Sequence, residues 1–272
     1  LVKLIILFLK NSFDMFFSIT PKAGFISSIA GLFSKIKHRV HIFTGQVWYT
    51  KKGLVRYILK KFDQIIGILN SECLVDSFSQ KEFLINEKVF KSSDANLTVV
   101  GEGSICGVDT NIFYKIDKNH KTKLKEKFKL DKDSKVIVFL GRLNKDKGVF
   151  DLAKAFDEVK KNYKKKLYLL YVGFDEQNCI DKIKQQSDNF NDMVFYNYSG
   201  NPCEYLQIAD IFCLPSYREG FGLSALEAGA CNLPSVTSNT VGLSDVIIQN
   251  KTGYLHEPGN VEQIKDNLLK FL

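Results

Sequence analysis

Two glycine-containing loops in the second half of the chain carry charged residues suited to a phosphorylated ligand. The first loop opens with Gly141 and Arg142 and closes with Lys147 and Gly148. Glycine lets the backbone approach a ligand closely, and a helix beginning after Gly148 offers free N–H groups. Arginine presents a planar fork to phosphate oxygens and lysine a point charge, so the pair predicts a diphosphate site. Taken alone, this loop is equally compatible with two surface cations at a helix start.

The second loop combines a tight glycine turn with two carboxylates. Gly220 and Gly222 precede a strongly helix-forming stretch over 223–230, which leaves Glu219 in the loop and Glu227 about one turn inside the helix. A carboxylate accepts hydrogen bonds from adjacent hydroxyls, as on a sugar or a ribose. The two loops together therefore predict a site that holds a sugar, a diphosphate and a ribose in sequence. Taken alone, each glutamate is more often a helix-start charge or a solvated helix residue.

The elements that position these loops form a regular alternation. In the second half, apolar strands over 136–140, 167–172, 193–196, 211–215 and 234–237 alternate with helices near 148–161, 177–186, 203–209 and 223–230. Nearly continuous apolar strands separated by helices predict a parallel sheet covered on both faces. Ligands of such sheets bind at the carboxyl ends of the strands. Both charged loops follow strands, so the prediction places them at that edge.

The first half has a similar but weaker rhythm. Its patterns predict strands over 13–19, 40–43, 65–69 and 97–100, and helices over 1–11, around 25–36, over 54–62 and around 72–89. A lysine-rich polar segment follows over 114–135 and is interpreted as a solvated face or linker. We therefore predict two α/β domains, 1–113 and 114–272, in agreement with a prior of about 150 residues per domain.

The amino-acid composition excludes several classes of protein. The 272 residues are 45% hydrophobic, which excludes intrinsic disorder, and Lys and Arg exceed Asp and Glu by 38 to 30, which favours an anionic partner. No nucleic-acid-binding motif is present. Six scattered cysteines without a C-x-x-C pair favour a reducing compartment over a disulfide or zinc framework. The apolar run over 1–9 is shorter than the roughly 20 residues that span a bilayer. Asp131 and Asp133 lie in the lysine-rich segment and are interpreted as solvated, not as metal ligands.

Taken together, the motifs resemble the family 4 retaining glycosyltransferases. The resemblance covers nearly the whole chain and is carried by Gly141-Arg142-Leu143 with Lys147-Gly148, by Glu219-x7-Glu227, and by the segments 20–24, 107–113, 209–216 and 252–255. It implies the GT-B fold, in which two Rossmann-like parallel-sheet domains face a cleft. The family's glycine-rich N-terminal loop and its terminal crossing helix are both absent, so the N-terminal domain is expected to be incomplete and the chain truncated at both ends.

The resemblance also implies roles for individual residues. Arg142 and Lys147 would neutralise the donor diphosphate as the leaving group gains charge, so neither a divalent metal nor a cofactor is required. Glu219 would contact the donor sugar, and Glu227 would hold the ribose hydroxyls. The donor-binding set is completed by Gly141, by the backbone N–H groups of Phe221, Gly222 and Leu223, and by Asn197, Tyr198 and Ser199 beside the base.

Acceptor contacts are expected from loops of the first domain. The predicted residues are Lys22, Gly24, Thr44, Gly45 and Gln46. Many members place a histidine immediately before the glycine at Gly45, where this chain has Thr44. The nearest histidine is His41, inside a strand, and a lone strand histidine is more often a core residue than a catalyst.

The expected activity is retaining transfer of a sugar from a nucleotide-sugar, with UDP-sugar favoured, to a glycan or polyprenyl-linked acceptor in cell-surface polysaccharide biosynthesis. Basic stripes over 34–39 and 51–61 beside apolar residues suggest a cytoplasmic protein in peripheral contact with the anionic inner face of the plasma membrane. Ordinary core helices with solvated lysines explain these stripes equally well.

Two alternatives remain open. The first is a non-catalytic remnant that binds a nucleotide-sugar. The second is an NAD-dependent oxidoreductase, because Gly101, Gly103 and Gly107 roughly imitate the dinucleotide fingerprint after a strand. The third glycine comes one residue late, and no amphipathic helix pattern follows it.

Overall fold

The computed structural model describes residues 1–94, 96–197 and 201–272, which divide into two compact units. The first unit comprises Leu1–Cys106 together with Arg218–Phe221. The second comprises Gly107–Tyr217 and Gly222–Leu272. The continuous part of the first unit thus ends seven residues before the boundary predicted at 113.

The first unit is built on a parallel sheet with the strand order β1-β2-β3-β4. The strands are β1 (Met15–Ser18), β2 (His38–Phe43), β3 (Glu72–Val75) and β4 (Leu97–Val99), and the helices are α1 (Val2–Asn11), α2 (Pro21–Phe33), α3 (Gly53–Leu69) and α4 (Phe78–Asn86). Proline at the first turn of α2 costs no hydrogen bond, and the Ser77 side chain accepts from the Gln80 N–H to cap α4. Each strand is therefore followed by a helix or loop at its carboxyl end, as the predicted class requires.

The strand predicted over 65–69 is wrong, because these residues form the last turns of α3. Ile66 is fully buried, whereas Ile68 is 79% exposed, and this alternation follows the helical period instead of the strand period. The helix ends where the Asn70 N–H bonds to the Ile66 carbonyl. The strand lies next along the chain, at Glu72–Val75, inside the stretch predicted to be helical.

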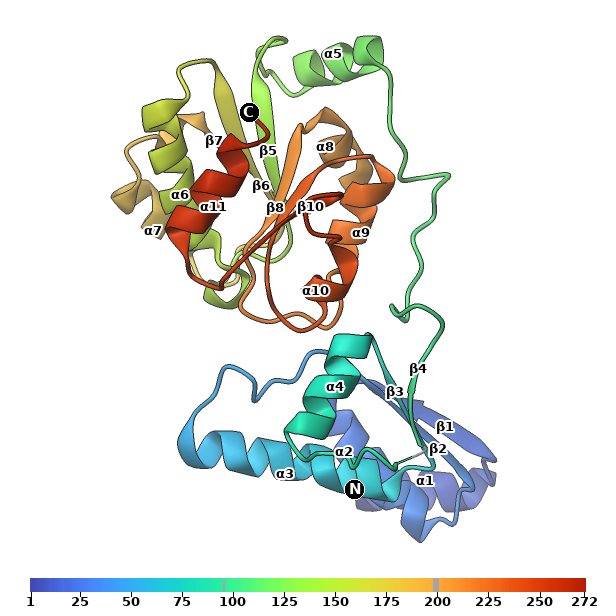
Figure 1. Cartoon of the computed structure of the whole chain (residues 1–272). Coiled ribbons are helices and arrows are strands. Elements are labelled where there is room, and N and C mark those ends of the chain that lie inside the picture. Colours follow the sequence, from blue (N-terminus) through green and yellow to red (C-terminus); the bar gives the residue numbers. More distant parts are fainter. Residues whose placement is uncertain (95, 198–200) are drawn as a thin grey trace. The chain divides into compact units, whose positions relative to one another are not determined.

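The second unit is a parallel sheet with the order β10-β9-β8-β5-β6-β7, which confirms the predicted architecture. Its strands are β5 (Lys135–Leu140), β6 (Leu167–Val172), β7 (Met193–Tyr196), β8 (Ile211–Leu214), β9 (Ser235–Ser238) and β10 (Gly253–His256). Figure 1 shows α6 (Val149–Asn162), α7 (Cys179–Gln186) and α11 (Val261–Leu269) on one side of the sheet and α8 (Pro202–Ile208) and α9 (Leu223–Ala230) on the other. Central strand β5 is buried almost throughout, which explains its unbroken apolar sequence.

Several elements of the second unit were not predicted, among them β10, the short helix α10 (Leu243–Val246) and α5 (Lys118–Lys127). Helix α5 lies in the lysine-rich segment that the sequence indicated as a linker. The Asp117 side chain caps it, and the Lys125 ammonium is buried and donates to the Ser134 carbonyl at 2.6 Å. The long lysine stems cover apolar surface while their charged ends find partners, so a lysine-rich sequence is compatible with a packed helix.

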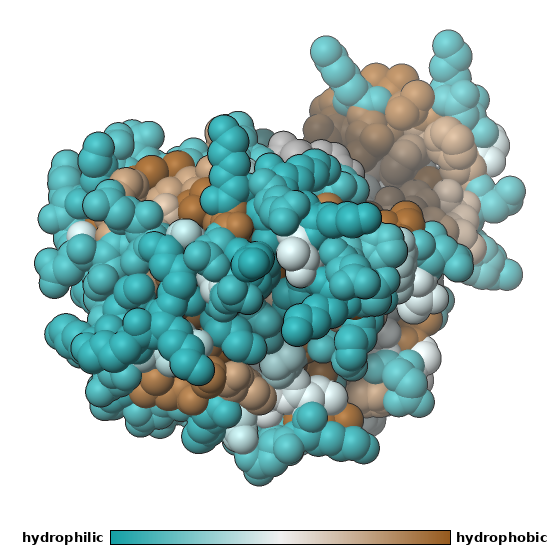
Figure 2. Space-filling model, turned by 90° about the horizontal axis from the view of Figure 1, so that it is seen from above, coloured by the Kyte–Doolittle hydropathy of each residue, from teal (hydrophilic) through white to brown (hydrophobic). Residues whose placement is uncertain are grey.

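Most of the large apolar side chains that the structure exposes belong to the first unit. Figure 2 shows a face on which hydrophilic residues predominate and hydrophobic residues gather in patches. Among the described residues, no helix is both long enough and apolar enough to cross a membrane.

Candidate functional site

The loops that carry the predicted donor residues follow neighbouring strands. Strand β5 lies between β8 and β6 in the second sheet, and all three run parallel. Their carboxyl ends therefore share one edge of the sheet. The loops after β5, β6 and β8 meet there, which is where parallel sheets of this kind bind ligands.

The loop after β5 is held in one conformation by a glycine and an asparagine. The Asn144 side chain accepts from the Lys147 N–H at 3.1 Å and caps the short 3₁₀ turn Lys145–Lys147. Gly148 follows with a φ of +69°, and a Cβ at that position would stand 2.0 Å from the Pro215 carbonyl oxygen. Glycine is thus required both by the backbone conformation and by the close approach of the segment that follows β8. Lys147 is placed at a defined point beside the start of α6.

A glutamate that the sequence reasoning missed joins the cations of this loop. The Glu176 carboxylate, in the loop after β6, bonds to the Arg142 guanidinium at 2.8 Å and to the Asn144 amide at 2.6 Å. Hydrogen bonds from Asn144 and Arg142 hold the pKa of Glu176 below its usual value, and the charges of Arg142 and Lys147 lower it further. Arg142 thus bonds directly to this carboxylate, and the charge of Lys147 also acts on it.

The loop after β8 leads into α9, which supplies the second half of the predicted donor site. Gly222 has a φ of +91° and is the N-cap residue of the helix, which starts at Leu223. The Tyr217 N–H donates to the Asp146 carbonyl at 2.8 Å, so this loop is bonded to the loop after β5. Glu227 lies on the second turn of α9, half-buried, and burial raises the pKa of its carboxyl. A partly dehydrated carboxyl of this kind gains from hydroxyl donors.

Glu219 and its neighbours belong by their contacts to the first unit. The Arg218 guanidinium donates to the Gly45 carbonyl at 3.0 Å. A Cβ on Gly45 would stand 2.6 Å from the Glu219 carbonyl oxygen, and one on Gly220 would meet the Asp76 carboxylate at the same distance. The structure therefore brings the predicted residue Gly45 against the backbone of Glu219. Asp76, at the carboxyl end of β3, was not predicted; burial raises its pKa to about 6.

The other predicted acceptor-side residues differ in their surroundings. Lys22 and Thr44 are exposed, whereas Gln46 is buried and its amide nitrogen donates to the Thr44 carbonyl at 3.0 Å. Gly24 is buried in α2, where a Cβ would stand 2.3 Å from the His41 ring. Packing against His41 therefore explains why glycine occupies this position.

His41 has the environment of a core histidine. It is 1% exposed, and its Nδ1 lies 2.9 Å from the Ser18 hydroxyl. Burial lowers its pKa to about 4, so the imidazole is neutral at physiological pH. A buried, neutral ring with a fixed partner agrees with the interpretation of His41 as a structural residue.

Two of the three residues predicted beside the nucleotide base, Tyr198 and Ser199, lie outside the described residues. Asn197 is described and is exposed, directly after β7. The glycines of the dinucleotide-like segment, Gly101–Gly107, follow β4, and within the described part of the chain no helix begins after them until Lys118. The helix start that would bind a dinucleotide phosphate is thus missing from this segment.

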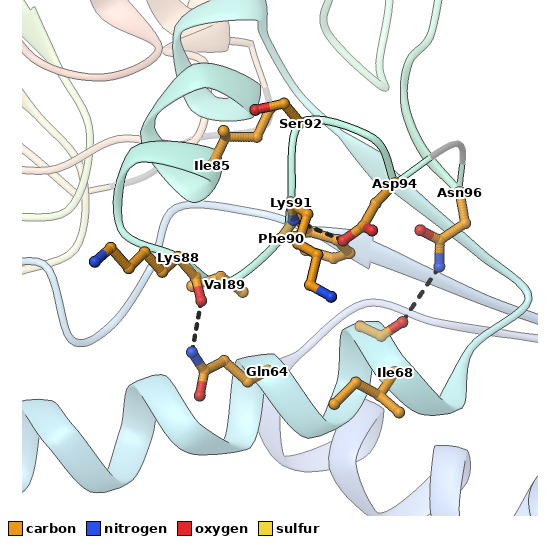
Figure 3. A pocket seen from close by; sticks show the side chains of 11 residues that line it. Gln64, Ile68, Ile85, Lys88, Val89, Phe90, Lys91, Ser92, Asp94 and Asn96 are labelled. Atoms are coloured by element: carbon orange, nitrogen blue, oxygen red, sulfur yellow. Dashed lines mark hydrogen bonds between the residues drawn. The ribbon is translucent and has the colours of Figure 1, made fainter.

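A pocket of the first unit is separate from these loops. It encloses about 840 Å³ and lies between the end of α3 and the segment that follows α4 (Figure 3). One wall is Asn96, which immediately precedes β4, so the pocket opens at the amino-terminal ends of the strands. Ligands of parallel sheets bind at the opposite edge, and we do not assign this pocket to the donor.

Comparison with known proteins shows the fold and the family. Among solved structures, the chain matches HepE from Anabaena in complex with UDP with a TM-score of 0.80 at 18% identity, covering 99% of this chain and 71% of that one. It matches sucrose-phosphate synthase from Thermosynechococcus elongatus with a TM-score of 0.80 at 19% identity, covering 97% and 66%. At these identities the likeness shows the fold, which is GT-B.

Sequence relatives carry the assignment further. The chain is 31% identical to the capsular polysaccharide biosynthesis glycosyltransferase CapM of Staphylococcus aureus, over 100% of this chain and 70% of that protein. It is 20% identical to the putative glycosyltransferase EpsD of Bacillus subtilis, over 91% of this chain and 64% of that protein. Residues 120–272 match the family described as Glycosyl transferases group 1. The chain therefore belongs to the Glycosyl transferases group 1 family, the enzymes that the paired loop motifs resembled.

Proposed function

We propose that this protein transfers a sugar from a UDP-sugar to a glycan or polyprenyl-linked acceptor, with retention of configuration, in cell-surface polysaccharide biosynthesis. The observation that supports the proposal is the loop after β5, which supplies two cations, Arg142 and Lys147, at the carboxyl edge of the sheet, with Arg142 bonded to the Glu176 carboxylate at 2.8 Å. A diphosphate fits such a position by charge and by the number of acceptor oxygens. The description of CapM as a capsular polysaccharide biosynthesis glycosyltransferase and the complex of HepE with UDP support the same class of reaction.

The proposed mechanism assigns the chemistry to this chain's own residues. As the bond between the sugar and the diphosphate breaks, negative charge grows on the leaving phosphate oxygens. Arg142 and Lys147 stabilise that charge from fixed positions, and the N–H groups at the start of α9 add to it. Fixed cations supply here the charge neutralisation that a bound divalent ion supplies in other transferases.

Glu227 and Glu219 hold the two sugars of the donor in this proposal. The half-buried Glu227 accepts hydrogen bonds from the ribose hydroxyls, and Glu219 contacts the transferred sugar. Gly45, which abuts the backbone of Glu219, is accordingly proposed to line the acceptor side together with Lys22, Thr44 and Gln46. The proposed location is the cytoplasmic face of the plasma membrane, in peripheral contact with it.

The test compares Lys147→Ala and Glu219→Ala with a matched control, Lys145→Ala. Lys145 lies in the same 3₁₀ turn as Lys147, but it is exposed and is given no role in the proposal. UDP binding is measured by calorimetry and sugar transfer by UDP release. Loss of a charge-assisted hydrogen bond costs about 1.5–3 kcal/mol, so Lys147→Ala should weaken UDP binding roughly 10- to 100-fold. Lys145→Ala should change it less than about twofold.

Each outcome distinguishes among the candidate functions. Transfer at near wild-type rate by Lys147→Ala or Glu219→Ala would contradict the roles assigned to them. UDP-sugar binding without any transfer by the wild-type chain would favour the non-catalytic alternative. A change in nicotinamide fluorescence on mixing would favour the oxidoreductase, whose dinucleotide-like segment lacks a following helix.

A further inference from the structure

Helix α3 turns an almost wholly apolar surface outward. At 100° per residue, its exposed positions from Leu54 onward fall within an arc of about 160°. We call these positions the outer stripe, and they comprise Leu54, Val55, Tyr57, Ile58, Lys61, Phe62, Ile65 and Ile68. Leu54 is 71% exposed and Ile68 79%. A helix on the surface of a globular protein ordinarily directs its polar face outward, so this arrangement is inverted and calls for a partner.

Polar contacts on the inner side of α3 fix the helix in this orientation. Asp63 is buried and accepts from the Trp48 indole N–H at 2.7 Å. Arg56 and Lys60 both bond to the Glu87 carboxylate at 2.7 Å. Rotating the helix to bury the outer stripe would break all three contacts and leave a buried aspartate without its partner. The exposure of the stripe is therefore built into the packing of the first unit.

Positive charge accompanies the outer stripe. Lys51 and Lys52 immediately precede α3, Lys61 lies within the stripe, and all three are exposed. Apolar side chains flanked by lysines are the pattern of a helix that lies in the plane of an anionic bilayer surface. The same charges would face one another across an interface between two copies of the chain, which disfavours self-association.

The far end of the outer stripe adds two more cations. Ile68 lines the 840 Å³ pocket together with Ile85 and Phe90, and Lys88 and Lys91 line the same pocket (Figure 3). Asp94 and the polar residues Gln64, Ser92 and Asn96 line the pocket as well, so its lining is mixed. The two lysines nevertheless add positive charge at the end of the stripe.

We infer that the outer stripe of α3, with Lys51, Lys52 and Lys61 beside it, docks on a bilayer that contains anionic lipid. The stripe enters the region between head groups and acyl chains, and the lysines bind the phosphates. Docking does not depend on the proposed transferase activity, because no donor residue takes part in it. A vesicle assay without any nucleotide can therefore fail or succeed independently of the proposed function.

The test is sedimentation of the full chain with vesicles of phosphatidylcholine, alone or mixed with an equal part of phosphatidylglycerol. The apolar variant is Ile58→Gln with Ile65→Gln, and the charge variant neutralises Lys51, Lys52 and Lys61 to Gln. The matched control is Lys123→Gln with Lys132→Gln, two exposed lysines of the second unit. All substituted side chains are exposed, so circular dichroism should show an unchanged fold.

The intact chain should sediment with the anionic vesicles and remain in solution with phosphatidylcholine alone. Each lysine near an anionic surface contributes about fivefold to partitioning, so the charge variant should lose binding on the order of 100-fold. Replacing the two isoleucines, which the bilayer would bury, should lower vesicle binding by more than about tenfold. Vesicle binding by the control variant should stay within about threefold of that of the intact chain, because salt screens the attraction between the vesicle and distant lysines.

Four results would overturn the inference. They are no sedimentation of the intact chain with the anionic vesicles, equal sedimentation with both vesicle types, an equal loss in the control variant, or a dimer in light scattering that the apolar variant dissociates. The last result would identify the outer stripe as an interface between two copies of the chain.

Discussion

Replacing Gly148 with alanine should lower the free energy of unfolding of the second unit by about 2–5 kcal/mol. The residue has a φ of +69°, and the left-handed conformation costs a non-glycine residue about 1–2 kcal/mol. A Cβ would also stand 2.0 Å from the Pro215 carbonyl oxygen, where real contacts stay beyond 3.0 Å. The backbone must then move by about 1 Å, and overpacking of this kind costs about 1–3 kcal/mol.

The assay is urea denaturation followed by far-ultraviolet circular dichroism, with Gly229→Ala as the matched control. Gly229 is exposed inside α9, and a Cβ there would meet no atom within 4 Å. Alanine should therefore stabilise that helix by about 0.5–1 kcal/mol. Because Gly148 directly follows Lys147, the first variant should also weaken UDP binding. A Gly148→Ala protein within 1 kcal/mol of wild type would refute the argument that the two loops are locked by this contact.

Two further predictions concern carboxylates. Burial raises the pKa of Asp63 from 3.8 to about 6, so the folded protein favours the protonated carboxyl. The free energy of unfolding is therefore highest below pH 4 and falls as the pH rises through 6, because the buried carboxyl then ionises. The Asp63→Asn side chain still accepts from the Trp48 indole N–H. This variant should be more stable than wild type by roughly 3 kcal/mol at pH 8 and equal to it near pH 4. The fluorescence of the single tryptophan follows unfolding in both proteins. Glu176→Gln should change stability by less than about 1 kcal/mol, because the Arg142 side chain is 59% exposed. It should weaken UDP binding roughly 2- to 10-fold because Arg142 loses its fixed orientation, whereas tighter binding in calorimetry would show that Glu176 competes with the diphosphate.

The second sheet could be predicted because its strands are buried on both faces. A strand such as Leu167–Val172 then reads as an unbroken apolar run, and the helices between the strands retain their own period. In the first unit, apolar sequence does not coincide with burial at α3, because apolar residues of this helix face outward and Asp63 faces inward. The run at 65–69 is apolar for a reason other than burial in a sheet, so hydrophobicity alone assigned it to a strand.

Spacing along the chain could single out the two charged loops but not every residue that bonds to them. Arg142 and Lys147 are five residues apart on one loop, so a single motif includes both. Glu176 lies 34 residues from Arg142 and has no motif of its own. It reaches the cations because β6 pairs with β5, a neighbour relation that the order of elements along the chain does not specify. Residues that orient a site from an adjacent strand are therefore the ones that a single sequence conceals.

The same pairing explains how exposed cations can act from fixed positions. The Leu143 N–H donates to the Phe174 carbonyl at 2.8 Å on the β6 side, and the Tyr217 N–H donates to the Asp146 carbonyl on the β8 side. The loop after β5 is thus bonded to both neighbours through its backbone, independently of any side chain. Charge stabilisation is most effective when the groups that provide it need not reorganise as the bond breaks. A backbone bonded on two sides provides that condition even though the Arg142 side chain is 59% exposed, and it is consistent with placing the proposed diphosphate site on a loop instead of in a closed core.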